Sequence, residues 1–201
     1  MNYDLTEMQH RLEKKLTPER YQHTLGVMYT CAALAMSHGY DMEKALVAGL
    51  LHDCAKCVSN EKKIKICEKH DIPISESEQN HPFLLHAKVG AHMARKKYGV
   101  EDEEILDAIR YHTTGRPDMT LLEKITYIAD YIEPWRNKAP NLDEIRKSAY
   151  SDIDTAAYLV LRDTLDYLKQ TGEELDPMTQ VAYEFYAEIY QQKLGVHWRE
   201  Q

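Results

Sequence analysis

The sequence has little of what several specialised protein classes require. Four cysteines in 201 residues are too few for a disulfide scaffold, and the CxxC spacing of Cys54 and Cys57 lacks the second pair that a zinc site would need. We expect reduced thiols, with a zinc or redox role for that pair as the weaker alternative. No apolar run approaches the ~20 residues that cross a bilayer, and no secretory signal opens the chain. These absences predict a cytoplasmic protein that does not enter a membrane.

Positive charge is also in deficit. Lysine and arginine total 25 against 33 aspartate and glutamate residues, a formal net charge of −8, and no long basic run occurs. This balance argues against nucleic acid as the main partner, although a local basic pocket could still hold phosphates. A hydrophobic content of 43% is enough for a core, so we expect a single domain over residues 1–201.

Helix start and stop signals recur along the whole chain. Thr17-Pro18 is an N-cap followed by proline at the first helical position, and Asp176-Pro177 repeats the arrangement. No stretch shows the alternation typical of strands. After a first polar helix, we predict helices over 18–38, 41–58, 59–70, 81–98, 101–112, 119–133, 141–149, about 151–171 and 177–195, with a loop over 71–81. The predicted fold class is all-α, an irregular multi-helix bundle whose core (about 18–136) is packed by C-terminal helices (about 141–196).

The most informative motif is the adjacent pair His52-Asp53, which follows an apolar run over residues 45–51. Two groups able to carry charge need partners in such a place, because uncompensated burial costs several kcal/mol or more. A divalent cation is a natural partner for an imidazole nitrogen and carboxylate oxygens. Further candidates lie on other predicted helices, namely His23, His86, His112 and Asp130. A single buried histidine is more often a hydrogen-bonded core residue, so it is the whole series that points to a metal site.

The order of these residues and their local sequences resemble the HD-domain superfamily of metal-dependent phosphohydrolases. The matching stretches are RYQHTLG (20–26), HDCAK (52–56), HP (81–82) with HAKVGA (86–91), HTTG (112–115) and DYIEPWR (130–136), and a looser match is DPMT (176–179). The flanking motifs look closest to the YqeK-like branch, similar to symmetrical diadenosine tetraphosphate hydrolases. The resemblance implies a bundle of the HD-domain type. It also implies one metal ion held by His23, His52, Asp53 and Asp130, and a second held by His86 and His112 with Asp53 bridging.

The chemistry of this ligand set agrees with the resemblance. All six ligands are imidazole or carboxylate and none is thiolate, which suits a borderline-to-hard divalent ion better than structural zinc. We expect one or two ions per chain, Fe first, with Mn, Co and Zn as alternatives. Two neighbouring cations can share a hydroxide and clamp the attacking and leaving oxygens of a phosphoryl displacement.

Three cations near these ligands are candidates for phosphate binding. Lys56 follows Asp53 by three residues and His52 by four, so helical geometry would place it on their face, where an ammonium could neutralise phosphate charge. Arg20 precedes His23 by three residues and could reach a phosphate bidentately. Arg136 lies just beyond a proline-ended helix, from which its loop could bend back over the site. Each of the three could instead be a surface cation.

Polar residues at helix ends complete the candidate substrate site. Thr113 and Thr114 follow His112 at a glycine turn, which either points donors at an anion or simply stops a helix. Asp176 and Thr179 open the last helix, whose N-terminus favours anions, although Asp176 is more simply an N-cap. Four tyrosines could stack a base, but their spacing fits core packing better: Tyr158, Tyr167, Tyr183 and Tyr186.

The resemblance implies hydrolysis of diadenosine tetraphosphate at its centre, giving two ADP through a metal-bound hydroxide. Catalytic roles would fall to Asp53, Lys56, His86 and His112. These four would also contact substrate, together with Arg20, Thr113, Thr114, Asp130, Arg136, Asp176 and Thr179. One alternative is an HD enzyme acting on other substrates: deoxynucleotides, nucleoside phosphates, cyclic dinucleotides or, with mixed-valent iron, carbon–hydrogen bonds. Another is a nucleotide-sensing module that turns nothing over. The resemblance also suggests a homodimer.

Overall fold

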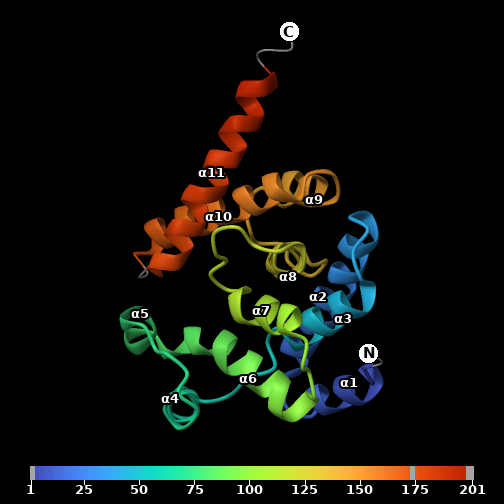
Figure 1. Ribbon diagram of the computed structural model, residues 1–201, viewed down its shortest axis with the longest axis vertical. Helices are drawn as coiled ribbons and strands as arrows, with labels where there is room; N and C mark the ends of the chain where they lie inside the picture. Colours follow the sequence, from blue (N-terminus) through green and yellow to red (C-terminus); the bar gives the residue numbers. More distant parts are fainter. Residues whose placement is uncertain (1–2, 173–174, 198–201) are drawn as a thin grey trace.

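The computed structural model describes residues 3–172 and 175–197, and every regular element within those ranges is a helix (Figure 1). The all-α prediction is therefore confirmed. The N-terminal part comprises α1 (Leu5–Glu13), α2 (Pro18–Ser37), α3 (Met42–Leu51), α4 (Asn60–Lys69), α5 (Glu76–Asn80) and the 3₁₀ helix η1 (Pro82–Leu85). It is followed by α6 (His86–Tyr98), α7 (Glu103–Tyr111), α8 (Leu121–Ile132), α9 (Leu142–Ser151), α10 (Ile153–Thr171) and α11 (Pro177–His197). No described helix is both long and apolar enough to span a membrane.

The N-cap predicted at Thr17 forms as the sequence indicates. The Thr17 hydroxyl accepts a hydrogen bond from the backbone N–H of Arg20 at the start of α2, and Asp41 caps α3 in the same way. Each satisfies a backbone donor that has no partner within its helix. The starts of these helices therefore lie within a residue of their predicted positions.

The second predicted helix ends earlier than expected, and the prediction that it runs to residue 58 is wrong. α3 stops at Leu51, and the next residues form turns held by backbone bonds such as Lys56 N to Asp53 O at 2.9 Å. Nδ1 of His52 donates to the carbonyl of Gly49 at 2.7 Å. That side chain occupies the carbonyl to which residue 53 would donate if the helix continued.

The segment over 71–81 is not the plain loop that we predicted. Ser75 and Glu78 form a reciprocal capping box that starts the five-residue helix α5. The predicted helix over 81–98 begins as the 3₁₀ turn η1 and becomes α-helical at His86. The Ser-x-x-Glu spacing of a capping box is present in the sequence, but the neighbouring prolines led us to predict a loop.

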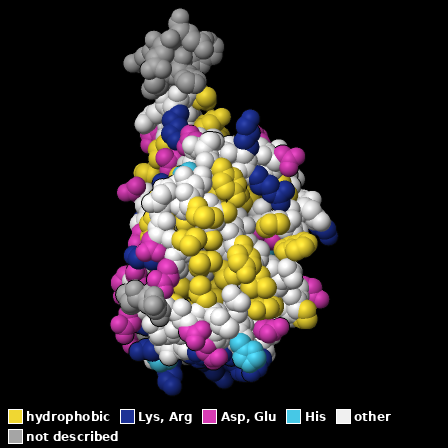
Figure 2. All heavy atoms as spheres, turned by 90° about the vertical axis from the view of Figure 1, so that its right-hand side faces the viewer, with side chains coloured by type: hydrophobic (Ala, Val, Ile, Leu, Met, Phe, Trp, Pro, Cys, Tyr) yellow, Lys and Arg dark blue, Asp and Glu magenta, His cyan; other side chains and the backbone are white. Residues whose placement is uncertain are grey.

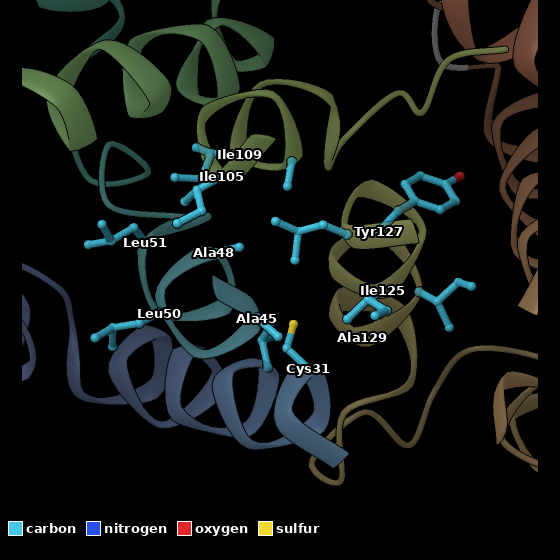
Figure 3. Packing of buried hydrophobic residues seen from close by; sticks show 14 of the residues in the cluster. Cys31, Ala45, Ala48, Leu50, Leu51, Ile105, Ile109, Ile125, Tyr127 and Ala129 are labelled. Carbon is cyan, nitrogen blue, oxygen red and sulfur yellow. The ribbon is translucent and has the colours of Figure 1, made fainter. Parts of the chain in front are cut away.

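Helices α2, α3, α7 and α8 meet in one apolar cluster (Figure 3), whose members include Cys31, Ala48, Ile109 and Ala129. α2 and α3 approach closely at Gly49, where an added Cβ would lie 2.9 Å from the Cα of Met28. α10 packs against α8, α9 and α11 in the upper part of Figure 1. This packing brings the C-terminal ends of α3 and α7 and the N-terminal end of α6, which carry polar side chains, next to α2 and α8.

Candidate metal centre

The structure brings all six predicted ligands together from five helices. α2 and α8 contribute from within a helix, α6 contributes its first residue, and α3 and α7 contribute the residues directly after their last turn. The side chains are His23, His52, Asp53, His86, His112 and Asp130. His52, Asp53, His86 and His112 are almost completely buried, the side chain of His23 is 11% exposed, and that of Asp130 is partly exposed.

Asp53 lies between two groups of imidazoles. Its Oδ2 is 3.5 Å from Nε2 of His52, whereas its Oδ1 is 3.3 Å from Nε2 of His86 and 3.6 Å from Nε2 of His112. On the His52 side, Asp130 Oδ1 is 3.9 Å from Nε2 of His52 and 3.0 Å from Nε2 of His23. One carboxylate thus faces both groups, which is the arrangement that a bridging ligand requires.

Three of the imidazoles have the same orientation for the same reason. His52, His86 and His112 each place Nδ1 2.7 Å from the carbonyl oxygen of the residue three positions earlier. A carbonyl only accepts, so each Nδ1 carries the proton and each Nε2 presents a lone pair to the centre. A metal-binding histidine usually donates its outer N–H to a backbone carbonyl, a carboxylate or a water in this way.

Several buried acceptor atoms in the centre lack a hydrogen-bond partner among the described residues, namely His23 Nε2, His52 Nε2 and Asp53 Oδ1. Nε2 of His86 also lies 3.2 Å from Nε2 of His112, and the backbone bonds leave both atoms as acceptors. Such converging lone pairs repel one another unless a cation lies among them. The donor set therefore fits one or two divalent cations.

The electrostatics of the site favour ionised carboxylates. Burial alone would raise the pKa of Asp53, but the charge that His52 carries when protonated, and the hydrogen bonds that His112, His52 and His86 donate in their protonated forms, hold it well below its usual value. Asp130 is affected in the same way: burial raises its pKa, and His23 and His52 lower it by more. Burial, with the nearby charge of Lys56, lowers the pKa of His86 to about 4. At neutral pH both carboxylates and His86 are therefore in the states that bind a metal.

His52 differs from His86 in its titration. Burial lowers the pKa of His52, but the charges of Asp53 and Asp130 and a hydrogen bond to Asp53 outweigh burial, so its pKa is raised. A cation at this position therefore competes with a proton.

Sequence reasoning missed Glu133, a buried carboxylate beside the centre. Its Oε1 lies 3.1 Å from Nδ1 of His23, and its Oε2 accepts a hydrogen bond from the backbone N–H of Trp135 at 2.8 Å. Gly26 leaves room for it, since an added Cβ there would lie 2.5 Å from Oε2. Glu133 supplies to His23 the acceptor that backbone carbonyls supply to the other three rings. The sequence feature that could have identified Glu133 is its position in the stretch DYIEPWR, three residues after Asp130.

The three predicted phosphate-binding cations reach the edge of the centre. Nη1 of Arg20 donates to Asp53 Oδ2 at 2.9 Å, and Arg136 bonds to Asp130 through its guanidinium. Nζ of Lys56 is 3.2 Å from Nε2 of His86 and 3.8 Å from Asp53 Oδ1. The prediction that helical geometry places Lys56 on the same face as His52 and Asp53 is wrong, because this segment forms turns and not a helix.

The remaining polar candidates line one cavity of about 800 Å³ beside the centre, and they are Thr113, Thr114, Asp176 and Thr179. The Thr113 hydroxyl lies 3.2 Å from Nε2 of both His86 and His112, so it links the cavity to the centre. Asp176 also caps α11 by accepting a hydrogen bond from the backbone N–H of Met178. This is the N-cap role that the sequence analysis gave as the simpler explanation for Asp176.

Two exposed aromatic side chains, Phe83 and Tyr167, line the same cavity. Phe83 was not predicted. Among the four candidate tyrosines, Tyr167 alone lines this cavity, since Tyr158 stacks on Tyr183 and Tyr186 is buried with its hydroxyl bonded to the backbone of α8's preceding loop. Aromatic faces of this kind can stack a nucleobase.

The cysteines do not contribute to the centre. All four are free thiols, and within the CxxC pair Cys54 is buried while Cys57 is exposed. Burial raises the pKa of the Cys54 thiol to about 12, and its Sγ donates to the carbonyl of Gly90. A thiol in that state is a packed core group and not a metal ligand.

The family described as HD domain matches residues 20–135 of the chain, a stretch that contains all six converging side chains. α9, α10 and α11 lie outside it.

Three known proteins with similar sequences have the same name. The chain is 44% identical over 173 residues to a Bacillus subtilis protein named symmetrical bis(5'-nucleosyl)-tetraphosphatase, covering 86% of this chain and 91% of that protein. A Staphylococcus aureus protein of the same name is 39% identical, with coverages of 80% and 83%. The fold matches a Clostridium acetobutylicum crystal structure, described as a predicted HD superfamily hydrolase involved in NAD metabolism, with a TM-score of 0.89. That structure is 39% identical, and the match covers 94% of this chain and 99% of that one.

Proposed function

The chain belongs to the HD domain family, and from this premise we propose that it is a metal-dependent hydrolase that cleaves diadenosine tetraphosphate at its centre into two ADP. One structural observation carries the proposal: buried imidazole and carboxylate acceptors converge and lack enough donors among the described residues. The name that these two relatives share, symmetrical bis(5'-nucleosyl)-tetraphosphatase, supports the substrate and the position of cleavage.

His23, His52, Asp53 and Asp130 would hold one ion, and His86 and His112, with Asp53 bridging, would hold the second. The two oxygens of Asp53 that face opposite groups support this division. When bound, divalent ions supply a water that ionises near neutral pH and neutralise charge on the phosphoryl oxygens. The nitrogen and oxygen donors favour Fe over structural zinc, with Mn and Co as further candidates.

The remaining side chains would bind and orient the substrate. Lys56, Arg20 and Arg136 border the centre with partly exposed charged ends, so they would hold phosphate oxygens by charge-assisted hydrogen bonds. Thr113 and Thr114 would direct hydroxyls to the phosphates from the neighbouring cavity. That cavity would take one adenine between Phe83 and Tyr167, and Asp176 and Thr179 would contact the nucleoside from the start of α11.

A nucleotide panel tests this function. Purified protein loaded with Fe, Mn, Co or Zn is given diadenosine tetraphosphate, deoxynucleoside triphosphates, nucleoside monophosphates and cyclic dinucleotides, and chromatography identifies the products. We expect diadenosine tetraphosphate to yield ADP alone. The formation of AMP and ATP as products would contradict central cleavage. Turnover of another nucleotide only would favour the alternative substrates. No turnover with any metal would favour a sensing module.

We also propose a homodimer. Figure 2 shows apolar side chains gathered on the face where α2 and α3 lie, and these helices expose Tyr29, Met36 and Met42. A contiguous apolar patch commonly marks a protein interface. Light scattering should report a dimer for the wild type and a monomer for Tyr29→Glu/Met36→Glu. A monomeric wild type would refute the proposal.

The free thiols fit a reducing compartment such as the cytoplasm.

A further inference from the structure

The cavity of about 800 Å³ has one polar side chain, Thr164, to which the proposed function gives no role. Thr164 lines the cavity together with Tyr167 and Leu168, and all three belong to α10. Residues three and four positions apart are neighbours on one face of a helix, so Thr164 lies one turn from the exposed ring of Tyr167. A base stacked on that ring would therefore have Thr164 near its edge.

The Thr164 hydroxyl presents a hydrogen-bond acceptor to the cavity. It donates its proton to the backbone carbonyl of Val160 at 2.8 Å. A hydroxyl has one proton and two lone pairs, so in this arrangement the group can only accept from a ligand. Such a bond is an ordinary local arrangement of threonine in a helix. The position of Thr164 in the cavity wall is what makes its acceptor available to a ligand.

The hydroxyl of Tyr127 on α8 does not use up this acceptor. It is buried and has no hydrogen-bond partner among the described residues. Burial raises the pKa of Tyr127, and an interaction with Thr164 opposes that shift. Because the proton of Thr164 is already donated, a protonated Tyr127 can approach Thr164 only as a donor. That contact would occupy at most one of the two lone pairs, so at least one remains for the cavity.

The base of the proposed substrate has one group that can donate to such an acceptor. The ring nitrogens N3 and N7 of adenine accept hydrogen bonds, and its exocyclic 6-amino group donates them. An acceptor at the edge of a stacked adenine therefore selects the amine. Hypoxanthine, the base of inosine, carries a carbonyl oxygen in place of that amine. Two acceptors would then face each other, which leaves both without a partner.

Two other acceptors that line the cavity are less suited to the amine. Thr114 donates its proton to the carbonyl of Gly115 at 2.9 Å, but it follows Thr113, whose hydroxyl contacts the metal centre. It therefore lies on the side where the phosphates would bind. The carboxylate of Asp176 has two oxygens and no proton, which suits the two hydroxyls of a ribose. Thr164 is on α10, which supplies none of the six ligands.

We propose that Thr164 determines the base preference of this site by accepting a hydrogen bond from the 6-amino group of an adenine stacked on Tyr167. This inference rests on the proposed function and adds recognition of the base to it. A site built to pair with a substrate amine discriminates against an analogue that lacks the amine. We expect kcat/KM for diadenosine tetraphosphate to be about tenfold higher than for diinosine tetraphosphate, as for one neutral hydrogen bond.

The test measures both substrates with the metal-loaded full-length wild type, Thr164→Val and Thr164→Ser. Valine keeps the shape of the side chain and removes the acceptor. We therefore expect KM for diadenosine tetraphosphate to rise by about threefold to tenfold, with kcat unchanged, and the preference over diinosine tetraphosphate to disappear. Serine keeps the hydroxyl and should keep most of the preference.

Thr171→Val is the matched control on the same helix. Thr171 also donates to a carbonyl of its own helix, that of Tyr167 at 3.1 Å, but it is exposed and does not line the cavity. This variant should retain the KM and the substrate preference of the wild type. A ratio of kcat/KM values for two substrates does not depend on the fraction of active enzyme. The comparison therefore holds even for a variant that is less stable.

Three results would overturn the inference. The first is equal kcat/KM for the two substrates in the wild type. The second is a preference in Thr164→Val equal to that of the wild type. The third is loss of the preference in Asp176→Asn alone, which would assign the amine to Asp176. A wild type that does not cleave diadenosine tetraphosphate would refute the proposed function itself, whereas equal cleavage of both substrates refutes the base recognition alone.

Discussion

The direction of each imidazole ring decides, at the scale of the residue, what the centre can bind. Three histidines are fixed by backbone carbonyls within their own helical turn, so their orientation follows from local geometry. His23 depends instead on Glu133, a residue 110 positions away. The four rings therefore differ in how far they depend on the rest of the fold.

Asp53→Ala should abolish turnover and deplete bound metal. Its two oxygens face His52 on one side and His86 and His112 on the other, so the alanine removes a ligand from both proposed ions. His86→Ala is the matched comparison and should lose mainly one of two equivalents. Elemental analysis after gel filtration measures both. Full occupancy in Asp53→Ala would contradict the proposed bridge.

Glu133→Ala should weaken metal binding without removing a ligand. Loss of an outer partner of a metal-binding histidine typically lowers metal affinity about 10–100-fold, and Glu133→Gln, which keeps an acceptor oxygen, should lose less. Chelator competition measures the affinity. The control is Glu123→Gln, which alters a buried carboxylate in the first turn of α8, one paired with Arg116 and not with the centre. Equal metal affinity in Glu133→Ala and the wild type would show that Glu133 does not position His23.

At the scale of the element, close packing of α2 on α3 holds His23 and the His52-Asp53 pair in register. Gly49 permits the approach, because its missing Cβ would lie 2.9 Å from both the Cα of Met28 and the Sγ of Cys31. The turn after α3 then redirects Asp53 and Lys56 into the site. Neither feature follows from helix propensity.

Gly49→Ala should destabilise the protein by about 1–3 kcal/mol, the usual range for overpacking a core, because the backbone of α2 must move. Gly195→Ala, in α11 with open space around the position, should be neutral or slightly stabilising. Urea unfolding of the two variants tests the difference. A Gly49→Ala variant as stable as the wild type would show that α2 and α3 adjust freely.

At the scale of the whole molecule, we propose that residues 1–201 form one folding unit, although the family match ends at residue 135. Arg146 on α9 donates to the backbone carbonyls of Ile132, Glu133 and Arg136. The C-terminal helices thereby hold the loop that carries both the partner of His23 and a proposed phosphate ligand.

A chain cut after residue 136 should therefore fail to form the centre. It exposes the face of α8 that packs on α10 and loses Arg146. We expect a lower melting temperature by calorimetry and less than stoichiometric metal. Arg146→Met in the full chain isolates the contribution of the loop, and it should weaken metal binding less than truncation does. A truncated chain with native stability and full metal content would refute the single unit.

The sequence by itself determined the helical class and the N-caps, because caps depend on residues close together in the chain. Its resemblance to a known family predicted the six side chains, which the structure then brings together. The sequence did not determine where the helix before His52-Asp53 ends, since a side chain there takes the carbonyl that would continue it. Only the tertiary structure revealed that Glu133 supports His23 and that Tyr167 and Phe83 share a cavity. Those relations join residues far apart in sequence, and they exist only once long-range packing has placed the helices.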